Sequence, residues 1–231
     1  WDVDALLLTH WHSDHIMGHA DLSTRARHTA RRIPPHCHPD SYAQVYSGQG
    51  DTIAEHFDFV PNGDGVPFRI GTFTFTPYRT DHNGRPGCMS YVCVEERTGV
   101  KMVFAWDIDL PGRKPPEMDR SNLDAFQRED FRAADLLIIE SNTWQVSEYV
   151  LAGEDRRTGH TNFLAGWQYV QACKPRTLGI THLSGHEDEV APDQHGYGWP
   201  DRRWIQEARA HAANDPIDGR RVHVHEFYQG M

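Results

Sequence analysis

The stretch from Val3 to His15, VDALLLTHWHSDH, joins an apolar run to a dense cluster of histidines and acids. The run Val3–Thr9 is continuous, apolar and of β length, which predicts a buried strand. Ser13 or Asp14 can cap a helix that follows it. The stretch therefore predicts a strand, a polar loop and a helix, with the histidines placed where the strand ends.

The spacing of these polar residues is typical of a metal site. In extended chain, residues two apart point the same way, so His10 and His12 can converge on one ion, while Asp14 and His15 can turn toward a neighbouring one. Imidazole and carboxylate are ligands for zinc and similar divalent metals. The alternative is a solvated loop with incidental histidines, which this spacing at a strand end disfavours.

The rest of the chain predicts a β-meander followed by alternating strands and helices. Expected strands cover residues 67–78, 89–95, 100–106, 134–140, 177–182 and 221–228, and expected helices cover 163–173 and 199–212. The polar, proline-rich stretch 110–131 is expected to be an insertion that runs over the surface, with a short helix at 123–128 and the role of a specificity lid. This order predicts an α/β protein of stacked sheets with helices outside them, in a single domain over residues 1–231.

Composition excludes several classes of protein. The 231 residues carry 23 Lys and Arg against 33 Asp and Glu, a formal charge of −10, so we expect no nucleic-acid partner. No apolar run approaches the roughly 20 residues that cross a bilayer. The four cysteines stand far apart, which predicts neither a disulfide framework nor a cysteine zinc site and favours the cytoplasm. Because the chain opens at Trp1, we expect the native N-terminus to be missing.

Three further residues of ligand type stand where predicted strands end: His82, Asp107 and His182. Each alone has an ordinary interpretation as a turn or capping residue. Together they favour one site, because open α/β folds place their sites at the carboxyl ends of strands. Asp109 is an alternative to Asp107, and we prefer Asp107 because it follows its strand directly. Glu140, at the end of another strand, is a candidate for orienting a ligand histidine.

In this order, the HxHxDH motif, the lone histidine, the strand-end aspartate and the strand-end histidine resemble the metallo-β-lactamase fold superfamily of dinuclear metallohydrolases. The resemblance covers nearly the whole chain. It implies a four-layer αββα sandwich that here lacks its first N-terminal strands. It also implies two divalent metal ions, with zinc preferred and manganese or iron as alternatives. The implied ligands are His10, His12 and His82 for one ion, Asp14, His15 and His182 for the other, and Asp107 as a bridge.

A second motif points to one branch of that superfamily. Gly159-His160-Thr161-Asn162 lies at the start of a predicted helix, and the stretch from there to His182 is similar to the phosphodiesterase branch, which includes ribonuclease Z and the phosphoribosyl cyclic phosphate phosphodiesterase. By that likeness His160 contacts the scissile phosphate and protonates the leaving oxygen. The plain alternative for His160 is an ordinary residue at a helix start.

These features predict a metal-dependent hydrolase. The resemblance implies a phosphodiesterase that acts on a small phosphodiester, with cyclic ones among the candidates, through a metal-bridging hydroxide, with Asp14 and His160 as catalytic residues. A lactonase or thioesterase of the same fold, or a non-hydrolytic metal-binding member, remains an alternative. The expected partner is a small-molecule substrate, and a homodimer is left open.

Overall fold

The computed structural model describes residues 3–12, 15, 28, 32–48, 58–82, 84, 86–111, 121–145, 160–183 and 199–226. These residues form two sheets. The smaller one has the order β1-β2-β3, and its strands pair in parallel. Its strands are β1 (Leu6–Leu7), β2 (Pro35–Cys37) and β3 (Val60–Pro61). A backbone hydrogen bond of 2.9 Å from Met89 to Thr9 ties the end of this first segment to the larger sheet.

The larger sheet has seven strands in the order β10-β9-β8-β7-β6-β5-β4. From β4 to β7 neighbouring strands are antiparallel, and from β7 to β10 they are parallel. Its strands are β4 (Phe68–Ile70), β5 (Phe73–Arg79), β6 (Met89–Glu95), β7 (Lys101–Ala105), β8 (Leu136–Glu140), β9 (Thr177–Thr181) and β10 (His223–Glu226). Because β5 and β7 are both antiparallel to β6, β5 runs in the same direction as β7, β8 and β9.

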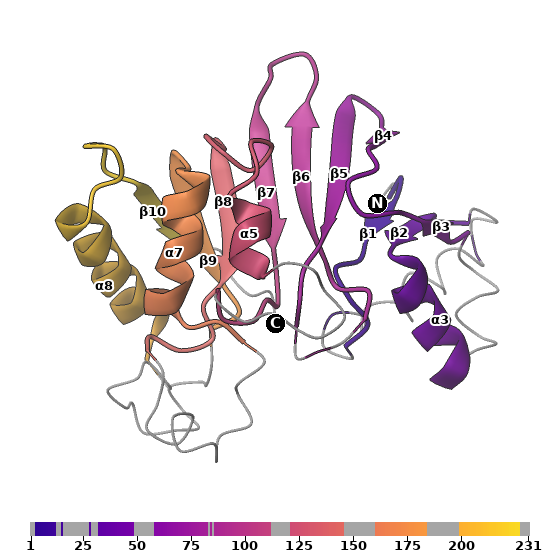
Figure 1. The fold of residues 1–231 in the computed structure, drawn as a ribbon, viewed down its shortest axis with the longest axis horizontal. Coiled ribbons are helices and arrows are strands. Elements are labelled where there is room, and N and C mark those ends of the chain that lie inside the picture. The colour runs from indigo at the N-terminus through magenta and orange to yellow at the C-terminus, as the bar shows by residue number, and fades with distance from the viewer. Residues whose placement is uncertain are drawn as a thin grey trace.

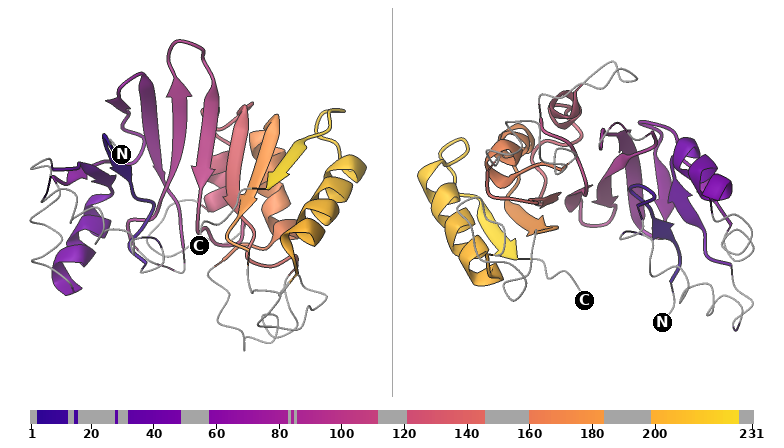
Figure 2. Two further views of the ribbon diagram at one scale, coloured as in Figure 1. Left: turned by 180° about the vertical axis from the view of Figure 1, so that it is seen from behind. Right: turned by 90° about the horizontal axis from the view of Figure 1, so that it is seen from below.

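Three of the described helices pack on one face of the larger sheet, and a fourth lies next to the smaller sheet (Figure 1). Figure 1 shows α5 (Asn122–Phe126), α7 (Phe163–Cys173) and α8 (Asp201–Asn214) on the same face of the seven-stranded sheet. The helix α3 (Pro39–Gly48) lies next to the three-stranded sheet, at the opposite end of the molecule from α8 (Figures 1 and 2). Helix α7 begins where expected because the Asn162 side chain accepts a hydrogen bond from the Ala165 N–H.

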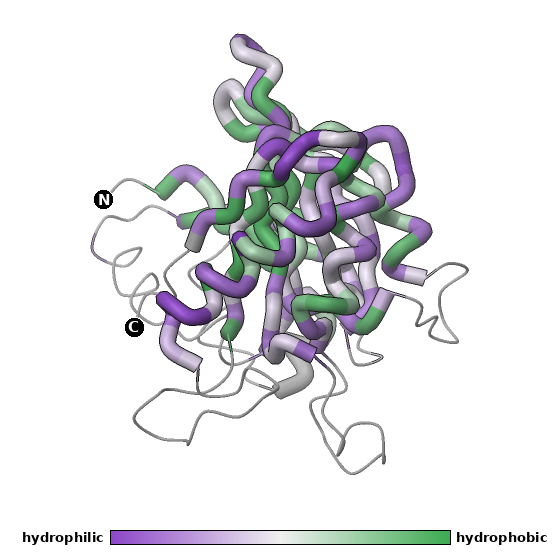
Figure 3. Tube along the Cα trace, turned by 90° about the vertical axis from the view of Figure 1, so that its left-hand side faces the viewer, coloured by the Kyte–Doolittle hydropathy of each residue, from purple (hydrophilic) through white to green (hydrophobic). Residues whose placement is uncertain are grey.

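The main core lies between this helical layer and the sheet. Its largest buried side chains include Trp204 of α8, Tyr169 of α7 and Phe126 of α5, each 0% exposed. Figure 3 shows hydrophobic residues, in green, alternating with hydrophilic ones, in purple, along much of the chain. The four cysteines are free and buried, so none of them forms a disulfide. Among the described residues, no helix has both the length and the apolar character needed to span a bilayer.

Most predicted elements are present, with three differences. The expected strand 67–78 is two strands, because Gly71, with a φ of 59°, allows the chain to turn between β4 and β5. The expected strand 3–9 is paired only at Leu6–Leu7, where β2 is its one neighbour in the described chain. The expected helix after Asp14 lies outside the described residues, apart from His15, which is helical.

The third difference concerns the insertion. Residues 112–120 are not among those described, and within 121–131 residues 124 and 127–130 are exposed while others are buried. Ala125, Phe126 and Phe131 are buried in the main core, and α5 packs against α7. The expected short helix at 123–128 is present as α5, but the polar average composition of 110–131 concealed that its apolar positions bury one face in the core. The described part of the insertion therefore contributes to the core, and the role of a lid stays a prediction.

Candidate metal centre

One edge of the larger sheet collects the chemically active side chains. Since β5, β7, β8 and β9 run in the same direction, their carboxyl ends meet at that edge, the lower one in Figure 1. His82 follows β5, Asp107 follows β7, Glu140 ends β8 and His182 follows β9. The segment after β1 brings His10 to the same place.

Two of these residues adopt an unusual backbone conformation. Asp107 has a φ of 47° and His182 a φ of 57°, both in the left-handed region that side chains other than glycine rarely occupy. Such a conformation costs on the order of 1–3 kcal/mol and is concentrated at functional sites. Ala133, Lys174 and Asp218 share this conformation away from the site, so the strain at the two strand ends accompanies the motif and is not an independent sign of function.

The first group of ligand atoms comprises His10, His12, His82 and Asp107. The Nδ1 atom of His12 lies 2.8 Å from Nε2 of His10 and 3.0 Å from Nε2 of His82. The Oδ2 atom of Asp107 lies 3.3 Å from Nε2 of His10 and 3.5 Å from Nε2 of His82. A tetrahedral zinc ion with bonds of about 2.0–2.1 Å separates its ligands by roughly 3.3 Å, so these spacings suit a single ion.

The second group comprises Asp107, Glu140, His160 and His182. The Nε2 atom of His182 lies 3.6 Å from Oδ1 of Asp107. The Nδ1 atom of His160 lies 2.7 Å from Oε2 of Glu140, which is also 3.5 Å from Nδ1 of His182. His15 approaches the same aspartate, with its Nε2 3.0 Å from Oδ2 of Asp107. Asp107 therefore stands between two neighbouring groups of donors.

The protonation of the first group favours metal binding. Burial, as the largest cause, and the neighbouring histidines together lower the pKa of His82 to about 3, against the opposing effect of Asp107. The imidazole is then neutral, which is the form that binds a metal. Burial by itself would raise the pKa of Asp107, but contacts with His10 and His15 outweigh it and hold this pKa well below its usual range.

Glu140 and His160 form a buried pair with a different character. Burial raises the pKa of the fully buried Glu140 carboxyl, against the opposing effect of His160. The backbone N–H groups of Ile108 and Thr161 also donate hydrogen bonds to Glu140. Burial by itself would lower the pKa of His160, but Glu140 outweighs it and raises that pKa to about 9. Glu140 is thus held in place by hydrogen bonds and orients the His160 ring.

The donor set fits a divalent cation. Both carboxylate oxygens of Asp107 are buried, and among the described residues neither accepts a hydrogen bond of normal geometry. A buried carboxylate without hydrogen bonds is costly unless cations compensate it. Imidazole and carboxylate together suit zinc, manganese and iron. Asp107 therefore has the surroundings of a metal ligand rather than of a structural acid.

The structure brings together all the described residues that the sequence indicated for the site. The histidines at positions 10, 12, 15, 82, 160 and 182 lie around Asp107, and Asp14 lies outside the described residues. Asp109 belongs to neither group, so Asp107 is the acid between them. The sequence indicated that Glu140 would orient a histidine but not which one. Its partner His160 is 20 residues away, and only the fold brings the two together.

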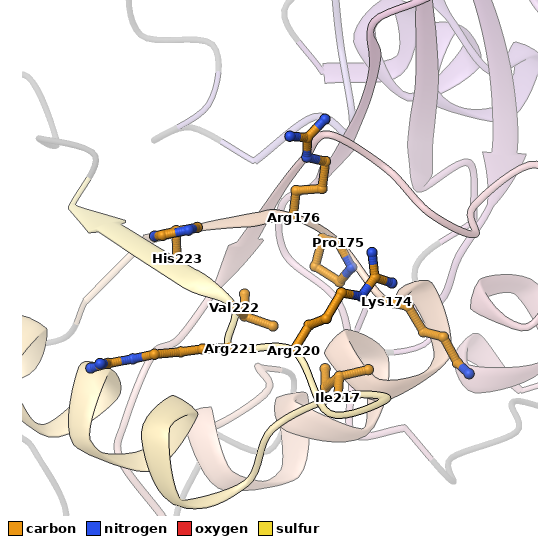
Figure 4. Close-up of a pocket in the computed structure, with 8 residues that line it drawn as sticks. All are labelled: Lys174, Pro175, Arg176, Ile217, Arg220, Arg221, Val222 and His223. Carbon is orange, nitrogen blue, oxygen red and sulfur yellow. The ribbon is translucent and has the colours of Figure 1, made fainter.

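A second feature lies at the opposite edge of the sheet, before β9 and β10. It is a pocket of about 510 Å³ whose lining includes Lys174, Arg176, Arg220 and Arg221 (Figure 4). Lys174 pairs with Asp218 at 2.8 Å and Arg176 with Asp135 at 3.5 Å. The figure shows the basic side chains pointing in different directions. This pocket is therefore separate from the metal groups.

Comparison with known proteins identifies the family. A model of the beta-lactamase superfamily domain matches residues 1–183. No curated protein sequence matches the chain. Among solved structures, the metallo-β-lactamase fold protein YhfI from Bacillus subtilis is similar, with a TM-score of 0.66 and 20% identity over 99% of this chain and 76% of that one.

Two further structures share the fold. Unliganded yeast PDE1 is similar with a TM-score of 0.71 and 10% identity over 98% of this chain and 67% of that one. A diphosphatase from the PhnP family is similar with a TM-score of 0.57 and 15% identity over 86% of this chain and 68% of that one. The chain therefore belongs to the beta-lactamase superfamily and has the metallo-β-lactamase fold, that of a family of metal-dependent hydrolases.

Proposed function

We propose that this protein is a dinuclear metal-dependent phosphodiesterase that acts on a small phosphodiester, with cyclic phosphates as the first candidates. The observation that carries the proposal is the position of Asp107. Its buried carboxylate faces His10, His15 and His82 through Oδ2 and His182 through Oδ1. An acid shared in this way between two groups of imidazoles is the arrangement that two adjacent cations require.

The ligand assignment is the one that the family resemblance implies, and Asp14 lies outside the described residues. One ion would be held by His10, His12 and His82, the second by Asp14, His15 and His182, and both by Asp107. Zinc is the preferred metal, with manganese or iron as alternatives. Two such ions supply activation of water and stabilisation of the negative charge that develops on the substrate.

The pair Glu140–His160 favours a phosphodiester over a lactone or thioester. Because Nδ1 of His160 faces Glu140, its Nε2 is the atom that can give a proton to a substrate. The side chain is 23% exposed, so it is accessible from the site. A proton donor beside the metals is needed when the leaving group is a poor one such as an alkoxide. The PhnP-family diphosphatase shows that this fold also serves phosphate chemistry.

The test combines metal content with substrate turnover. Elemental analysis of protein purified without added metal should find about two zinc, manganese or iron ions per chain. The same sample should hydrolyse bis(p-nitrophenyl) phosphate and cyclic phosphates, and should act poorly on lactones and thioesters. Turnover of lactones or thioesters alone would contradict the proposed substrate class. Bound metal without turnover of any ester would favour a binding protein instead.

A further inference from the structure

Asn122 is the first residue of α5 and lies in the segment that was expected to be a surface insertion. Its side chain is 0% exposed. An amide buried this deeply must find partners for its N–H and C=O groups, because leaving them unpaired costs about 1–3 kcal/mol each. The partners of Asn122 lie 41 residues earlier in the chain, in the loop that carries His82.

The Asn122 amide binds both backbone groups of a single residue. The Asp81 N–H donates to Oδ1 of Asn122 at 2.6 Å, and Nδ2 of Asn122 donates to the Asp81 C=O at 2.9 Å. Strand β5 has already ended at Arg79, so no strand ladder holds the chain here. The Asn122 amide thus makes the two backbone hydrogen bonds that a neighbouring strand would otherwise make with Asp81, the residue immediately before His82.

The same contact links the two loops that carry metal-group residues. The Asp81 C=O also accepts a hydrogen bond of 2.9 Å from the N–H of Asp109, two residues after Asp107. The Tyr169 hydroxyl donates to the Asp109 C=O at 2.7 Å. Burial raises the pKa of Tyr169 well above its usual value, so the hydroxyl keeps its proton and remains a donor. Asn122 and Tyr169 therefore fix the spacing between the loops after β5 and β7.

Helix α5 is itself well anchored. Ser121 and Asp124 form a capping box at its start, and Phe126 packs against Tyr169 with ring centroids 4.5 Å apart. The Leu123 N–H donates to the Pro111 C=O at 3.2 Å, close to where the Asp107 loop leaves the sheet. The position of Asn122 is thus set by the core and not by the loop that it holds.

We propose that Asn122 is a positioning residue of the metal centre, which sets the distance between His82 and Asp107 and thereby the affinity for metal. The inference rests on the proposed function, because it assumes that these two residues bind the same ion. Residues that orient metal ligands typically contribute about 10–100-fold to metal affinity or activity. This role would make the insertion at 110–131 part of the support of the metal centre, which differs from the role of a lid.

The test measures zinc affinity by competition with a chelating dye, using variants shown by circular dichroism to be folded at the temperature of the assay. Asn122→Ala removes both hydrogen bonds. Asn122→Asp keeps the shape and the acceptor but turns an oxygen toward the Asp81 carbonyl. Both should weaken zinc binding by about 10–100-fold. Tyr169→Phe, which removes one hydroxyl, should cause a smaller loss in the same direction.

The matched control is Ser121→Ala. It removes the cap of the same helix, at a cost of about 1 kcal/mol of stability, without touching the Asp81 loop. Its melting temperature should fall while its zinc affinity stays within about threefold of the parent, a change equivalent to under 1 kcal/mol. Zinc affinities of the Asn122 variants equal to the parent, or equal to Ser121→Ala, would overturn the positioning role. A parent protein that takes up no zinc, manganese or iron would instead overturn the proposed function.

Discussion

The two edges of the seven-stranded sheet both carry charged side chains, and they compensate the charge in different ways. At the carboxyl ends of the strands, Asp107 and Glu140 are buried among imidazoles. At the amino ends of β9 and β10, Lys174 and Arg176 are 35% and 74% exposed and pair with aspartates in water. Exposed pairs contribute about 0–1 kcal/mol, whereas a buried charge requires close partners. The charges of the candidate site are therefore the ones that water does not screen, whereas those at the opposite edge are screened.

The largest effect is expected from Asp107→Asn. The amide keeps the size of the side chain but removes the charge shared by the two groups, so metal content should fall and turnover should drop by about 10⁴-fold or more. Metal content by elemental analysis and the initial rate with bis(p-nitrophenyl) phosphate are the measurements. Asp109→Asn is the matched control and should keep its metal. If Asp109→Asn loses metal and Asp107→Asn retains it, Asp109 is the shared acid.

A smaller effect is expected from His160→Ala. Turnover should fall by about 10²–10⁴-fold at unchanged metal content, because the variant removes the proposed proton donor and none of the proposed ligands. The loss should be greater for an alkyl phosphodiester than for bis(p-nitrophenyl) phosphate, since p-nitrophenolate leaves without much help from an acid. The ratio of kcat values for the two substrates measures this. An equal loss on both substrates would contradict the role of His160 as the acid.

Metal removal should lower the stability of the protein, with an effect smaller than those on turnover above and larger than that of an exposed ion pair. Each ion bound only to the folded chain adds about 2.7–4.1 kcal/mol when its concentration exceeds Kd by 100–1,000-fold. For a chain of this size the loss of one ion corresponds to a fall in Tm on the order of 5–15 °C, and the loss of both to about twice that. Thermal unfolding followed by circular dichroism, with and without a chelator, checks the value. Asp107→Asn should show little response to the chelator, and a full response would argue against its role.

The smallest effect is expected at the opposite edge. Lys174→Ala breaks the exposed pair with Asp218 and should change the free energy of unfolding by less than about 1 kcal/mol. Metal content and turnover should stay at the parent values. Urea unfolding and the phosphodiesterase assay are the measurements. A marked loss of turnover in Lys174→Ala would mean that the two edges are coupled through the strands between them.

The sequence was sufficient for elements with a strong local pattern. The strand Met89–Glu95 and the helix Phe163–Cys173 lie at the predicted residues, because the first is a run of strand-forming residues between turns and the second has a capping asparagine, Asn162. The break at Gly71 was missed, because the apolar residues of 67–78 alternate on both sides of it and conceal the turn. Local patterns thus locate elements well and small interruptions poorly.

For the site, the sequence indicated the residues but not all of their relations. A histidine or acid at the end of an apolar run is visible in the sequence, which is why His82 and Asp107 could be singled out. The sequence favoured Asp107 over Asp109 because Asp107 follows its strand directly, and in the structure Asp107 and not Asp109 lies in both groups. Asn122 gave no signal at all, because a single asparagine in a polar stretch has no periodicity and its partner Asp81 is 41 residues away.

The left-handed backbone at Asp107 and His182 has a consequence for the evolution of this protein. Glycine adopts that conformation without strain, so replacing either residue by glycine relieves part of the cost of folding while it removes a candidate ligand. Without metal such a variant would gain stability, whereas with metal present it would lose the stability that the bound ions contribute. Heat-resistant variants sought in the laboratory should therefore be screened for metal as well as for melting temperature.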